Sequence, residues 1–341
     1  MTDTTTAQRP PHILLNQMIT GSWVTQAIFV AAELGVADLL KSEALTSAEI
    51  AVRLGGNRDG LYRILRALAS IGIFREDGDG RFEQTTLSEC LRSDVAGSMR
   101  AWARMAGAKW HWDSLAGLLN SARTGQKSPL NTWEHFEQHK DDADIFNQAM
   151  TSFSASEIGP ILESYDFTGI QRLMDVAGGY GSLLAAVLEA NPQMRGVLFD
   201  APSVIENARS KMAATKVVDR CELVGGDFFV SVPSGVDAIM MKHIIHDWDD
   251  ENSLRILKCC HKALRAGGKL LVIESVIQPG NDPSPGKMLD IVMLLIGGRE
   301  RTEAEFRALM DAAGFDLTRI VPTASPVSVV EGRKRDRKSV G

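Results

Sequence analysis

The chain has 341 residues, of which 44% are hydrophobic and 23% charged, a composition typical of a globular protein of about two domains. Its net charge of −6 at pH 7 argues against a nucleic-acid-binding protein, which would more often be basic. The four cysteines show no CxxC spacing, so we expect neither a disulfide framework nor a metal site, and a cytoplasmic location fits.

Residues 13–40 carry apolar side chains at helical spacing, and no membrane span is predicted there. The most apolar stretch, 27–40, is interrupted by Glu33 and Asp38, and the polar start of the chain lacks the apolar core of a signal peptide. The apolar positions lie on more than one face of the expected helices, so these helices need a partner surface. That surface is either the body of the same chain or a second copy in a homodimer.

Residues 46–82 have the pattern of a winged helix. Thr46 and Glu49 form a predicted capping box for one helix, and a second amphipathic helix runs from Arg58 to Ile71. The run Asp-Gly-Asp-Gly at 77–80 is a hairpin turn signal between two short strands. Such a module either binds DNA or serves dimerisation, and the acidic residues around the second helix favour dimerisation. A winged-helix regulator that senses a ligand remains the alternative function.

Strands and helices alternate from residue 173 onward, which predicts a doubly wound α/β sheet. Two late apolar runs predict an antiparallel hairpin at one edge of that sheet. The expected domains are a helical and winged-helix dimerisation and substrate-pocket domain over 1–160, a catalytic domain over 161–332 and a disordered basic tail over 333–341. The expected strands are 173–176, 196–200, 221–224, 238–241, 269–274, 317–321 and 327–330.

A glycine-rich loop, DVAGGYG at 175–181, follows the first of these strands and predicts a nucleoside-containing ligand. Asp200 lies 22 residues after Gly178 at the end of the next strand, where a carboxylate typically binds ribose hydroxyls. The nicotinamide fingerprint is incomplete, because Leu184 stands where its third glycine would be. A carboxylate at Asp175 suits a ligand with an amino group, and S-adenosylmethionine has one.

The next two strand ends add candidate groups to the same site. After the third strand, Asp227 can accept from the amino group of adenine and Phe228 can stack on its ring. The fourth strand ends in KHIIHDW at 242–248, and the carboxyl ends of such strands are where chemistry concentrates. His246 is the candidate catalytic histidine, whereas His243 is expected to be structural.

The segments DVAGGYGSLL, FDAPSVIENA, GDFF, MKHIIHDWDDE, GGKLLVIES and GGRERTEAEF resemble the caffeic-acid and hydroxyindole type of S-adenosylmethionine-dependent O-methyltransferases. The resemblance covers nearly the whole chain. It implies a Rossmann-like class I methyltransferase domain, with a mostly parallel seven-stranded sheet and a late antiparallel hairpin, after a mainly helical winged-helix dimerisation domain. It also implies a homodimer of secondary metabolism that uses no metal, with neither nucleic acid nor membrane as partner.

The resemblance also assigns roles to residues. His246 matches the general base of the family, and Glu274 and Glu300 match the carboxylates that flank it. The implied activity, of the EC 2.1.1 class, moves a methyl group to a hydroxyl of an aromatic small molecule and leaves S-adenosyl-L-homocysteine; N-methylation or non-methyl chemistry is the alternative. The expected cofactor contacts are Asp175, Gly178, Asp200, Asp227, Phe228, Lys242 and Trp248, and the expected acceptor contacts are Asn147, Met150, Phe153, Met293 and Leu295.

Two residues depart from the pattern of the family. Ala177 replaces the first of three glycines, and Leu295 replaces an asparagine that contacts ring substituents in plant phenylpropanoid enzymes, which argues against a caffeate-like acceptor. A neutral imidazole is needed to remove the proton of a phenol as its oxygen attacks the methyl group. With an ordinary histidine pKa, the rate is therefore expected to fall as the pH drops through roughly 6–7.

Overall fold

The computed structural model describes residues 10–95 and 97–335, which separate into two compact units. The first contains the residues up to 113 together with 133–153, and the second contains 114–132 and the residues from 154 onward. The domain boundary expected at 160/161 falls instead inside the long helix α11 (Lys140–Ser164), which begins in the first unit and ends in the second. The helix continues through Gly159 and Pro160, although a Gly-Pro pair usually marks a turn.

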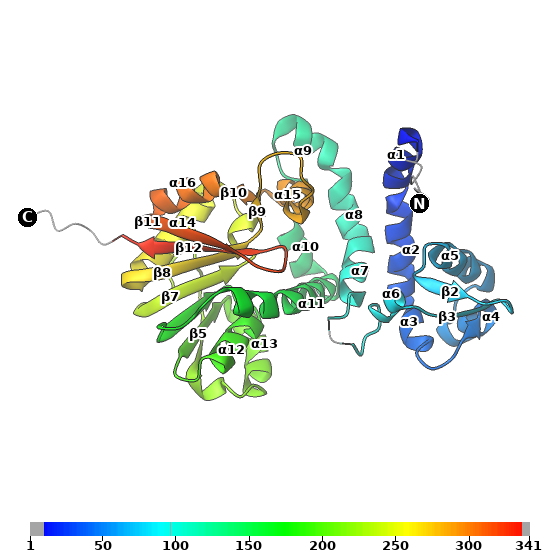
Figure 1. Ribbon diagram of the computed structural model, residues 1–341, viewed down its shortest axis with the longest axis horizontal. Helices are drawn as coiled ribbons and strands as arrows, with labels where there is room; N and C mark the ends of the chain where they lie inside the picture. The colour runs from blue at the N-terminus through cyan, green and yellow to red at the C-terminus, as the bar shows by residue number, and fades with distance from the viewer. Residues whose placement is uncertain (1–9, 96, 336–341) are drawn as a thin grey trace, which may run out of the picture. The chain divides into compact units, whose positions relative to one another are not determined.

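The first unit is made of short helices and a three-stranded sheet of order β1-β3-β2 (Figure 1). The capping box is formed as predicted: Thr46 Oγ1 accepts the Glu49 N–H at 3.3 Å, and Glu49 accepts the Thr46 N–H at 2.8 Å. Helices α4 and α5 and the three-stranded sheet form the predicted winged-helix pattern.

The elements of the first unit are α1 (Pro11–Ile19), α2 (Gly21–Leu34), α3 (Val36–Leu39), β1 (Leu45–Thr46), α4 (Ser47–Leu54), α5 (Arg58–Ser70), β2 (Phe74–Glu76), β3 (Arg81–Gln84), α6 (Thr86–Glu89), α7 (Arg100–Gly107) and α10 (Thr132–Gln138). Helix α8 (Lys109–Ala116) leads out of this unit.

Helices α1 and α2 carry an exposed apolar surface. Met18, Ile19 and Trp23 are 76%, 66% and 73% exposed. By length and composition, Pro11–Leu34 is apolar enough to cross a membrane, with a mean hydropathy of 1.2. The stretch 27–40, from which a span was excluded, overlaps only the end of this run. None of its apolar window is buried in the single chain.

The second unit is built on a seven-stranded sheet of order β11-β12-β8-β7-β4-β5-β6 (Figure 1). The five strands from β8 to β6 are parallel to one another, and β12 runs antiparallel to its two neighbours, β8 and β11. The predicted mostly parallel sheet with a late antiparallel hairpin is therefore confirmed. The strands are β4 (Arg172–Val176), β5 (Arg195–Asp200), β6 (Cys221–Gly225), β7 (Val236–Lys242), β8 (Leu264–Glu274), β11 (Phe315–Pro322) and β12 (Ser328–Lys334).

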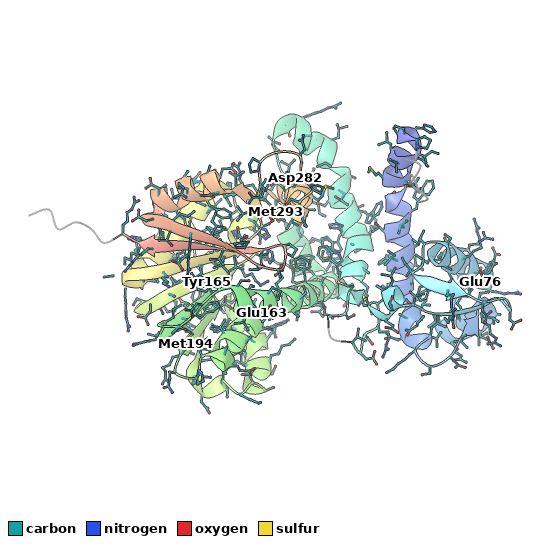
Figure 2. All side chains as sticks on the ribbon, in the orientation of Figure 1. Glu76, Glu163, Tyr165, Met194, Asp282 and Met293 are labelled. Atoms are coloured by element: carbon teal, nitrogen blue, oxygen red, sulfur yellow. The ribbon has the colours of Figure 1, made fainter. Side chains whose placement is uncertain are left out.

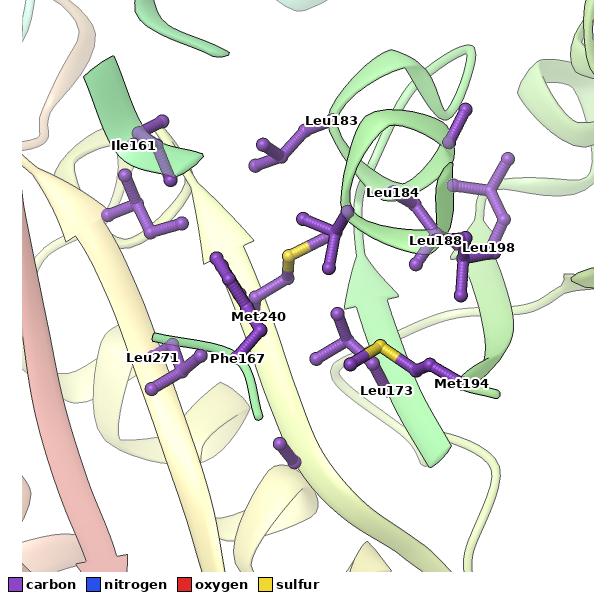
Figure 3. Packing of buried hydrophobic residues seen from close by; sticks show 14 of the residues in the cluster. Ile161, Phe167, Leu173, Leu183, Leu184, Leu188, Met194, Leu198, Met240 and Leu271 are labelled. Atoms are coloured by element: carbon purple, nitrogen blue, oxygen red, sulfur yellow. The ribbon is translucent and has the colours of Figure 1, made fainter. Parts of the chain in front are cut away.

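Helices cover both faces of this sheet. The core on one face includes Leu184 of α12 (Ser182–Ala190) and Leu198 of β5 (Figure 3). Ile205 of α13 (Pro202–Ala213) belongs to the same core. The core on the other face includes Leu257 of α14 and Phe306 of α16. This three-layer arrangement leaves the carboxyl ends of the parallel strands as the edge where loops carry polar side chains. The helices of this unit are α9 (Leu118–Thr124), α12 (Ser182–Ala190), α13 (Pro202–Ala213), α14 (Asp250–Ala263), α15 (Pro285–Ile296) and α16 (Glu303–Ala313).

The C-terminal strand extends further than the sequence indicated. The expected tail over 333–341 is wrong at its start, because Arg333 and Lys334 belong to β12, and Arg333 pairs with Lys269 of β8. The Arg335 N–H also donates to the Gly314 carbonyl at 2.9 Å. These basic side chains lie on a strand whose backbone continues the sheet, so composition alone was misleading. The rest of the expected tail, 336–341, lies outside the described residues.

Candidate active site

Acidic side chains from neighbouring strands meet at the carboxyl edge of the sheet. Asp175 lies near the end of β4, Asp200 ends β5 and Glu274 ends β8. β7 lies between β4 and β8 and ends in Lys242. The topology thus brings these four residues to one edge of the sheet, and their contact with a cofactor stays a prediction.

The loop after β4 requires a close approach of its backbone to neighbouring groups. A Cβ atom on Gly178 would lie 2.5 Å from the Asp175 carboxyl group, so only glycine fits at this position. Ala177, the residue that departs from the family pattern, has a φ of 56°, in the left-handed region. A residue with a Cβ atom pays about 1 kcal/mol or more in this conformation. Ala177 therefore adopts a backbone conformation that suits the glycine it replaces.

Asp175 is a buried carboxylate with no hydrogen-bond partner within the part of the chain that the structure describes. Burial raises its pKa to about 7, although the charge of Lys242 opposes that rise. A buried carboxylate without a partner is costly, and an ammonium group placed beside it would relieve that cost. The residue therefore fits the amino group of S-adenosylmethionine.

Asp200 is fixed by two backbone donors. Its Oδ2 accepts the Gly179 N–H at 2.8 Å, and its Oδ1 accepts the Ala201 N–H at 2.7 Å. Each carboxylate oxygen can accept more than one hydrogen bond, so capacity remains for the two hydroxyls of a ribose. Burial raises the pKa of this carboxyl group, and the two N–H donors oppose the rise.

The residues expected to hold adenine lie after β6. The Asp227 Oδ1 accepts the Phe229 N–H at 2.8 Å, and the Asp227 side chain is exposed. The ring of Phe228 contacts those of Phe229 and Trp248 edge-on, with centroids 4.8 and 6.1 Å apart. Phe228 and Trp248 are only partly buried, which leaves ring surface for a ligand.

The side chain of Lys242 is bound to a residue that the sequence analysis did not consider. Its Nζ donates to Glu157 Oε2 at 2.9 Å, and His243 Nε2 lies 3.0 Å from Glu157 Oε1. Glu157 comes from α11 and is completely buried. His243 is thus held in a structural network, in agreement with its expected role, while Lys242 has a protein partner besides any cofactor.

His246 lies in the short 3₁₀ turn η2 (Ile245–Asp247) that follows β7. Its Nδ1 is 2.7 Å from Glu300 Oε1, and its Nε2 is 3.5 Å from Asp247 Oδ1. The short bond to Glu300 favours the tautomer with the proton on Nδ1. In that tautomer Nε2 carries the lone pair that a general base needs.

Glu274 holds the backbone of the same turn rather than the imidazole ring. Its Oε1 accepts the N–H groups of Ile244 and His246 at 3.2 and 3.1 Å. Of the two carboxylates predicted to flank the base, Glu300 is the one that contacts the ring. Among the described residues, the second oxygen of each of these two carboxylates is buried without a hydrogen-bond partner.

The segment before α16 wraps closely around the turn that carries His246. A Cβ on Gly298 would lie 2.0 Å from the His246 carbonyl oxygen, and the Arg299 N–H donates to that oxygen at 2.8 Å. The buried guanidinium of Arg301 donates to the carbonyls of Ile245 and Trp248, both at 3.0 Å. A short parallel pair of strands, β9 (Val276–Ile277) and β10 (Arg301–Thr302), brings this segment beside the end of β8.

The carboxylates around His246 change its acid strength. Burial alone would lower its pKa, but the hydrogen bond to Glu300 and the charges of Asp247 and Glu274 raise it to about 9. The expected loss of activity between pH 6 and 7 rested on an ordinary histidine pKa, so the structure moves this limit to higher pH. Burial raises the pKa of Glu274 to about 7 and that of Asp247 to about 6.

The expected acceptor residues lie on two helices. Asn147 is exposed on α11, and Met150 and Phe153 are half-buried there, with the Phe153 ring stacked on Trp102 at 5.3 Å. Met293 and Leu295 are buried on α15 (Figure 2). The Leu295 carbonyl accepts the Ser128 N–H at 2.7 Å. Their contact with an acceptor remains a prediction.

A cavity of about 480 Å³ lies elsewhere in the second unit. Arg172, Arg195 and Cys221, at the amino ends of β4, β5 and β6, line it. This is the edge of the sheet opposite to Asp175 and Asp200, so the cavity is separate from the chemistry described above.

Glu157, Gly298 and Arg301 are the site residues that sequence reasoning missed. Gly298 and Arg301 lie in GGRERTEAEF, a segment that the resemblance had singled out, but only Glu300 was assigned there. The glycine pair was the available signal for a close backbone approach. Glu157 had no signal, because it lies 85 residues before Lys242 within a helix of mixed composition.

Two family models match the chain, one describing an O-methyltransferase domain over residues 116–316 and one describing an O-methyltransferase dimerisation domain over residues 16–94. The chain belongs to the O-methyltransferase family. The expected enzyme class is thereby confirmed as S-adenosylmethionine-dependent methyl transfer. The match of the winged-helix region to a dimerisation domain disfavours the alternative of a DNA-binding regulator.

Individual relatives agree with this assignment. The phenazine O-methyltransferase PhzM of Lysobacter antibioticus is 41% identical over 95% of this chain and 96% of its own. The crystal structure of LaPhzM superposes with a TM-score of 0.91 at 40% identity, covering 96% of this chain and all of its own. The structure of NcsB1 from neocarzinostatin biosynthesis, in complex with S-adenosyl-L-homocysteine and 1,4-dihydroxy-2-naphthoic acid, has a TM-score of 0.79 at 33% identity and covers 92% of this chain and 96% of its own.

Proposed function

We propose that this enzyme methylates a phenolic hydroxyl of a fused-ring aromatic metabolite and that His246 is its general base. The observation that carries the proposal is the buried pair of His246 and Glu300, at the same sheet edge as Asp175 and Asp200. The relatives named above act on or bind two- and three-ring aromatic compounds, which supports a flat acceptor of this size. Leu295, in place of an acceptor-side asparagine, supports an acceptor other than a caffeate-like phenol.

The residues at the carboxyl edge divide into two groups. Asp175 would bind the amino group of S-adenosylmethionine, Asp200 its ribose, and Asp227 with Phe228 its adenine. Gly178, the predicted contact in the loop, lets the backbone lie against Asp175. When bound, S-adenosylmethionine supplies an activated methyl group and leaves as S-adenosyl-L-homocysteine. Lys242 and Trp248 complete the predicted set of cofactor contacts.

His246 would remove the proton of the acceptor hydroxyl at its Nε2 atom. Glu300 keeps the other ring nitrogen protonated and stabilises the imidazolium that forms, because a carboxylate 2.7 Å away attracts that charge. Glu274, through two backbone N–H groups, keeps the turn in place. A hydroxyl with a pKa near 10 is mostly protonated at neutral pH, so removal of its proton raises the rate.

We also infer that the enzyme is a homodimer that joins through the apolar surface of α1 and α2. Three large apolar side chains on these helices, Met18, Ile19 and Trp23, are more than half exposed in the single chain. The match to a dimerisation domain over 16–94 covers them and supports a protein partner rather than a membrane. A cytoplasmic location stays part of the proposal.

The proposal is tested by incubation of the enzyme with methyl-labelled S-adenosylmethionine and a panel of acceptors. The panel contains hydroxylated phenazines, naphthoates and simple phenols, and each hydroxyl compound has an amino counterpart. Mass spectrometry then locates the added methyl group. Methylation of the fused-ring hydroxyl compounds, lost in His246→Ala, supports the proposal; transfer only to the amino compounds, or full activity of His246→Ala, contradicts it.

A further inference from the structure

We propose that Glu157 is a positioning residue, whose buried carboxylate joins Lys242 to His243 and thereby fixes the turn that carries His246. The inference rests on the proposed role of His246 as base. It adds a residue from α11 to a site otherwise built from the sheet edge and the segment before α16.

Both oxygens of Glu157 are used. Oε2 accepts from Lys242 Nζ at 2.9 Å, and Oε1 lies 3.0 Å from His243 Nε2. Glu157 is completely buried, and the side chains of Lys242 and His243 are only 11% and 16% exposed. The contacts reach Lys242, the last residue of β7, and His243, which lies two positions before η2 begins. One carboxylate therefore restrains the start of the turn from one side.

The charges of this cluster are balanced by the ion pair of Lys242 and Glu157, to which His243 adds a hydrogen bond. Burial by itself would raise the pKa of Glu157, but His243 and Lys242 outweigh it and hold that pKa below its usual range. Burial lowers the pKa of His243, so its neutral ring donates to an ionised Glu157. Removal of one partner from a buried ion pair leaves an uncompensated charge, which makes such pairs sensitive to substitution.

The backbone of His243 shows why the turn needs a restraint. Its φ is 56°, and apart from Ala177 no other non-glycine residue of the described chain has a positive φ. A histidine in this conformation is strained, and such residues persist only where their surroundings hold them. The contact with Glu157 is such a hold, and it keeps the His243 ring 5.1 Å from that of His246.

The same cluster connects the two halves of the site. The charge of Lys242 acts on Asp175, the carboxylate expected to bind the cofactor. On the other side, the ring of His243 faces His246, which also faces Asp247 from its own turn, Glu274 from β8 and Glu300 from the segment before α16. Loss of the Glu157 charge would leave Lys242 uncompensated, so the surroundings of His246 would become more positive.

The test compares Glu157→Gln with Glu331→Gln. Glu331 is also a buried carboxylate of the second unit, and it accepts from Tyr165, Thr318 and Arg319, but it lies on β12 away from His246 (Figure 2 labels Tyr165). Both substitutions replace a buried, hydrogen-bonded acid by its amide, so both are expected to lower the melting temperature. The melting temperature therefore measures the loss of stability, whereas kcat and the pKa of His246 measure the positioning of the base.

Glu157→Gln should lower kcat at least about tenfold and change the KM of the acceptor less than about threefold, because it disturbs the base rather than acceptor binding. It should also lower the pKa of His246 by about half a pH unit or more. That pKa is measured by NMR titration of ring-labelled histidine in the cofactor-free protein, with the signal assigned by its absence in His246→Ala. Glu331→Gln should leave both kcat and this titration unchanged.

His243→Asn is the second variant, because asparagine tolerates a positive φ but does not carry the imidazole that contacts Glu157. If the two residues act as one unit, the kcat loss of the double variant will be smaller than the product of the single losses. Should Glu157→Gln fail to fold, His243→Asn alone carries the test through kcat and the His246 titration.

An unmoved His246 titration in a folded Glu157→Gln, or a kcat loss no larger than that of Glu331→Gln, would overturn the proposal. Multiplicative losses in the double variant would overturn it as well. The NMR readout needs no turnover. If no acceptor of the panel is methylated, the proposed function fails while the titration still decides the role of Glu157.

Discussion

Replacement of Glu300 by glutamine is the most direct test of how the base works. The bond between His246 Nδ1 and Glu300 Oε1 is 2.7 Å long, and both residues are buried. A hydrogen bond to a charged group contributes about 1.5–3 kcal/mol, and about 1.4 kcal/mol corresponds to a factor of ten in rate. Glutamine offers only a neutral acceptor to the imidazolium that develops in the transition state. We therefore expect kcat to fall about 10- to 100-fold.

The pH dependence of the rate distinguishes loss of the Glu300 charge from a folding defect, because a folding defect would not shift the acidic limb of the profile to lower pH. The hydrogen bond to Glu300 is the largest of the effects that raise the pKa of His246 to about 9. Without that carboxylate the pKa falls toward the ordinary value, so the neutral base persists to lower pH. The acidic limb of the rate profile should then move down by about 1–2 pH units, although the maximum rate is smaller.

Initial rates with saturating labelled S-adenosylmethionine, measured between pH 5.5 and 10, provide the assay. Glu303→Gln is the matched control, since it makes the same substitution three residues further on, at an exposed acid that pairs with Arg307. A Glu300→Gln enzyme with kcat within about twofold of the parent and an unmoved acidic limb would refute the assignment of Glu300 as the partner of the base.

Three further predictions concern other parts of the molecule. Because burial raises the pKa of Asp175 to about 7, Asp175→Asn should raise the melting temperature of the cofactor-free protein at pH 8, and this gain should shrink as the pH falls below 7. Calorimetry should show weaker binding of S-adenosylmethionine to the same variant. A lower melting temperature with unchanged binding would contradict this prediction. Ala177→Gly should raise the free energy of unfolding by up to about 1 kcal/mol in urea titrations, because the φ of 56° suits glycine, and an equal loss would show that the conformation carries no strain. Met18→Asp should shift the protein toward monomer in sedimentation experiments, whereas Val230→Asp, a similarly exposed apolar position of the second unit, should not; a dimer unaffected by Met18→Asp would remove α1 from the interface.

The fold of the second unit could be predicted because its signals are local. Each expected strand was an apolar run bounded by a turn, and the acid at its end was visible in the same window, as with Asp200 and Glu274. The capping box at Thr46 likewise depends on residues three apart. The mostly parallel seven-stranded sheet with a late antiparallel hairpin followed from the family resemblance, and the structure confirms it.

The parts that sequence reasoning missed depend on contacts between distant segments. Nothing in the composition of α11 distinguishes Glu157 from a solvent-exposed acid, and only the fold places Lys242 and His243 against it. The elevated pKa of His246 has the same origin, since it results from carboxylates up to 54 residues away. The start of the expected tail was wrong because charge was taken as a sign of disorder where the backbone of Arg333 continues a sheet.

Helix α11 limits how this enzyme can be recombined with its relatives. The helix starts in one compact unit and supplies Glu157 in the other, and residues 114–132 also belong with the later part of the chain. A chimera joined at 160/161 would therefore combine a Glu157 from one parent with Lys242 and His243 from the other. Exchange of acceptor preference between two such enzymes should instead transplant α11 whole, together with the matching end of β7. The residues that must be exchanged together are therefore defined by their contacts in the fold and not by a continuous stretch of the sequence.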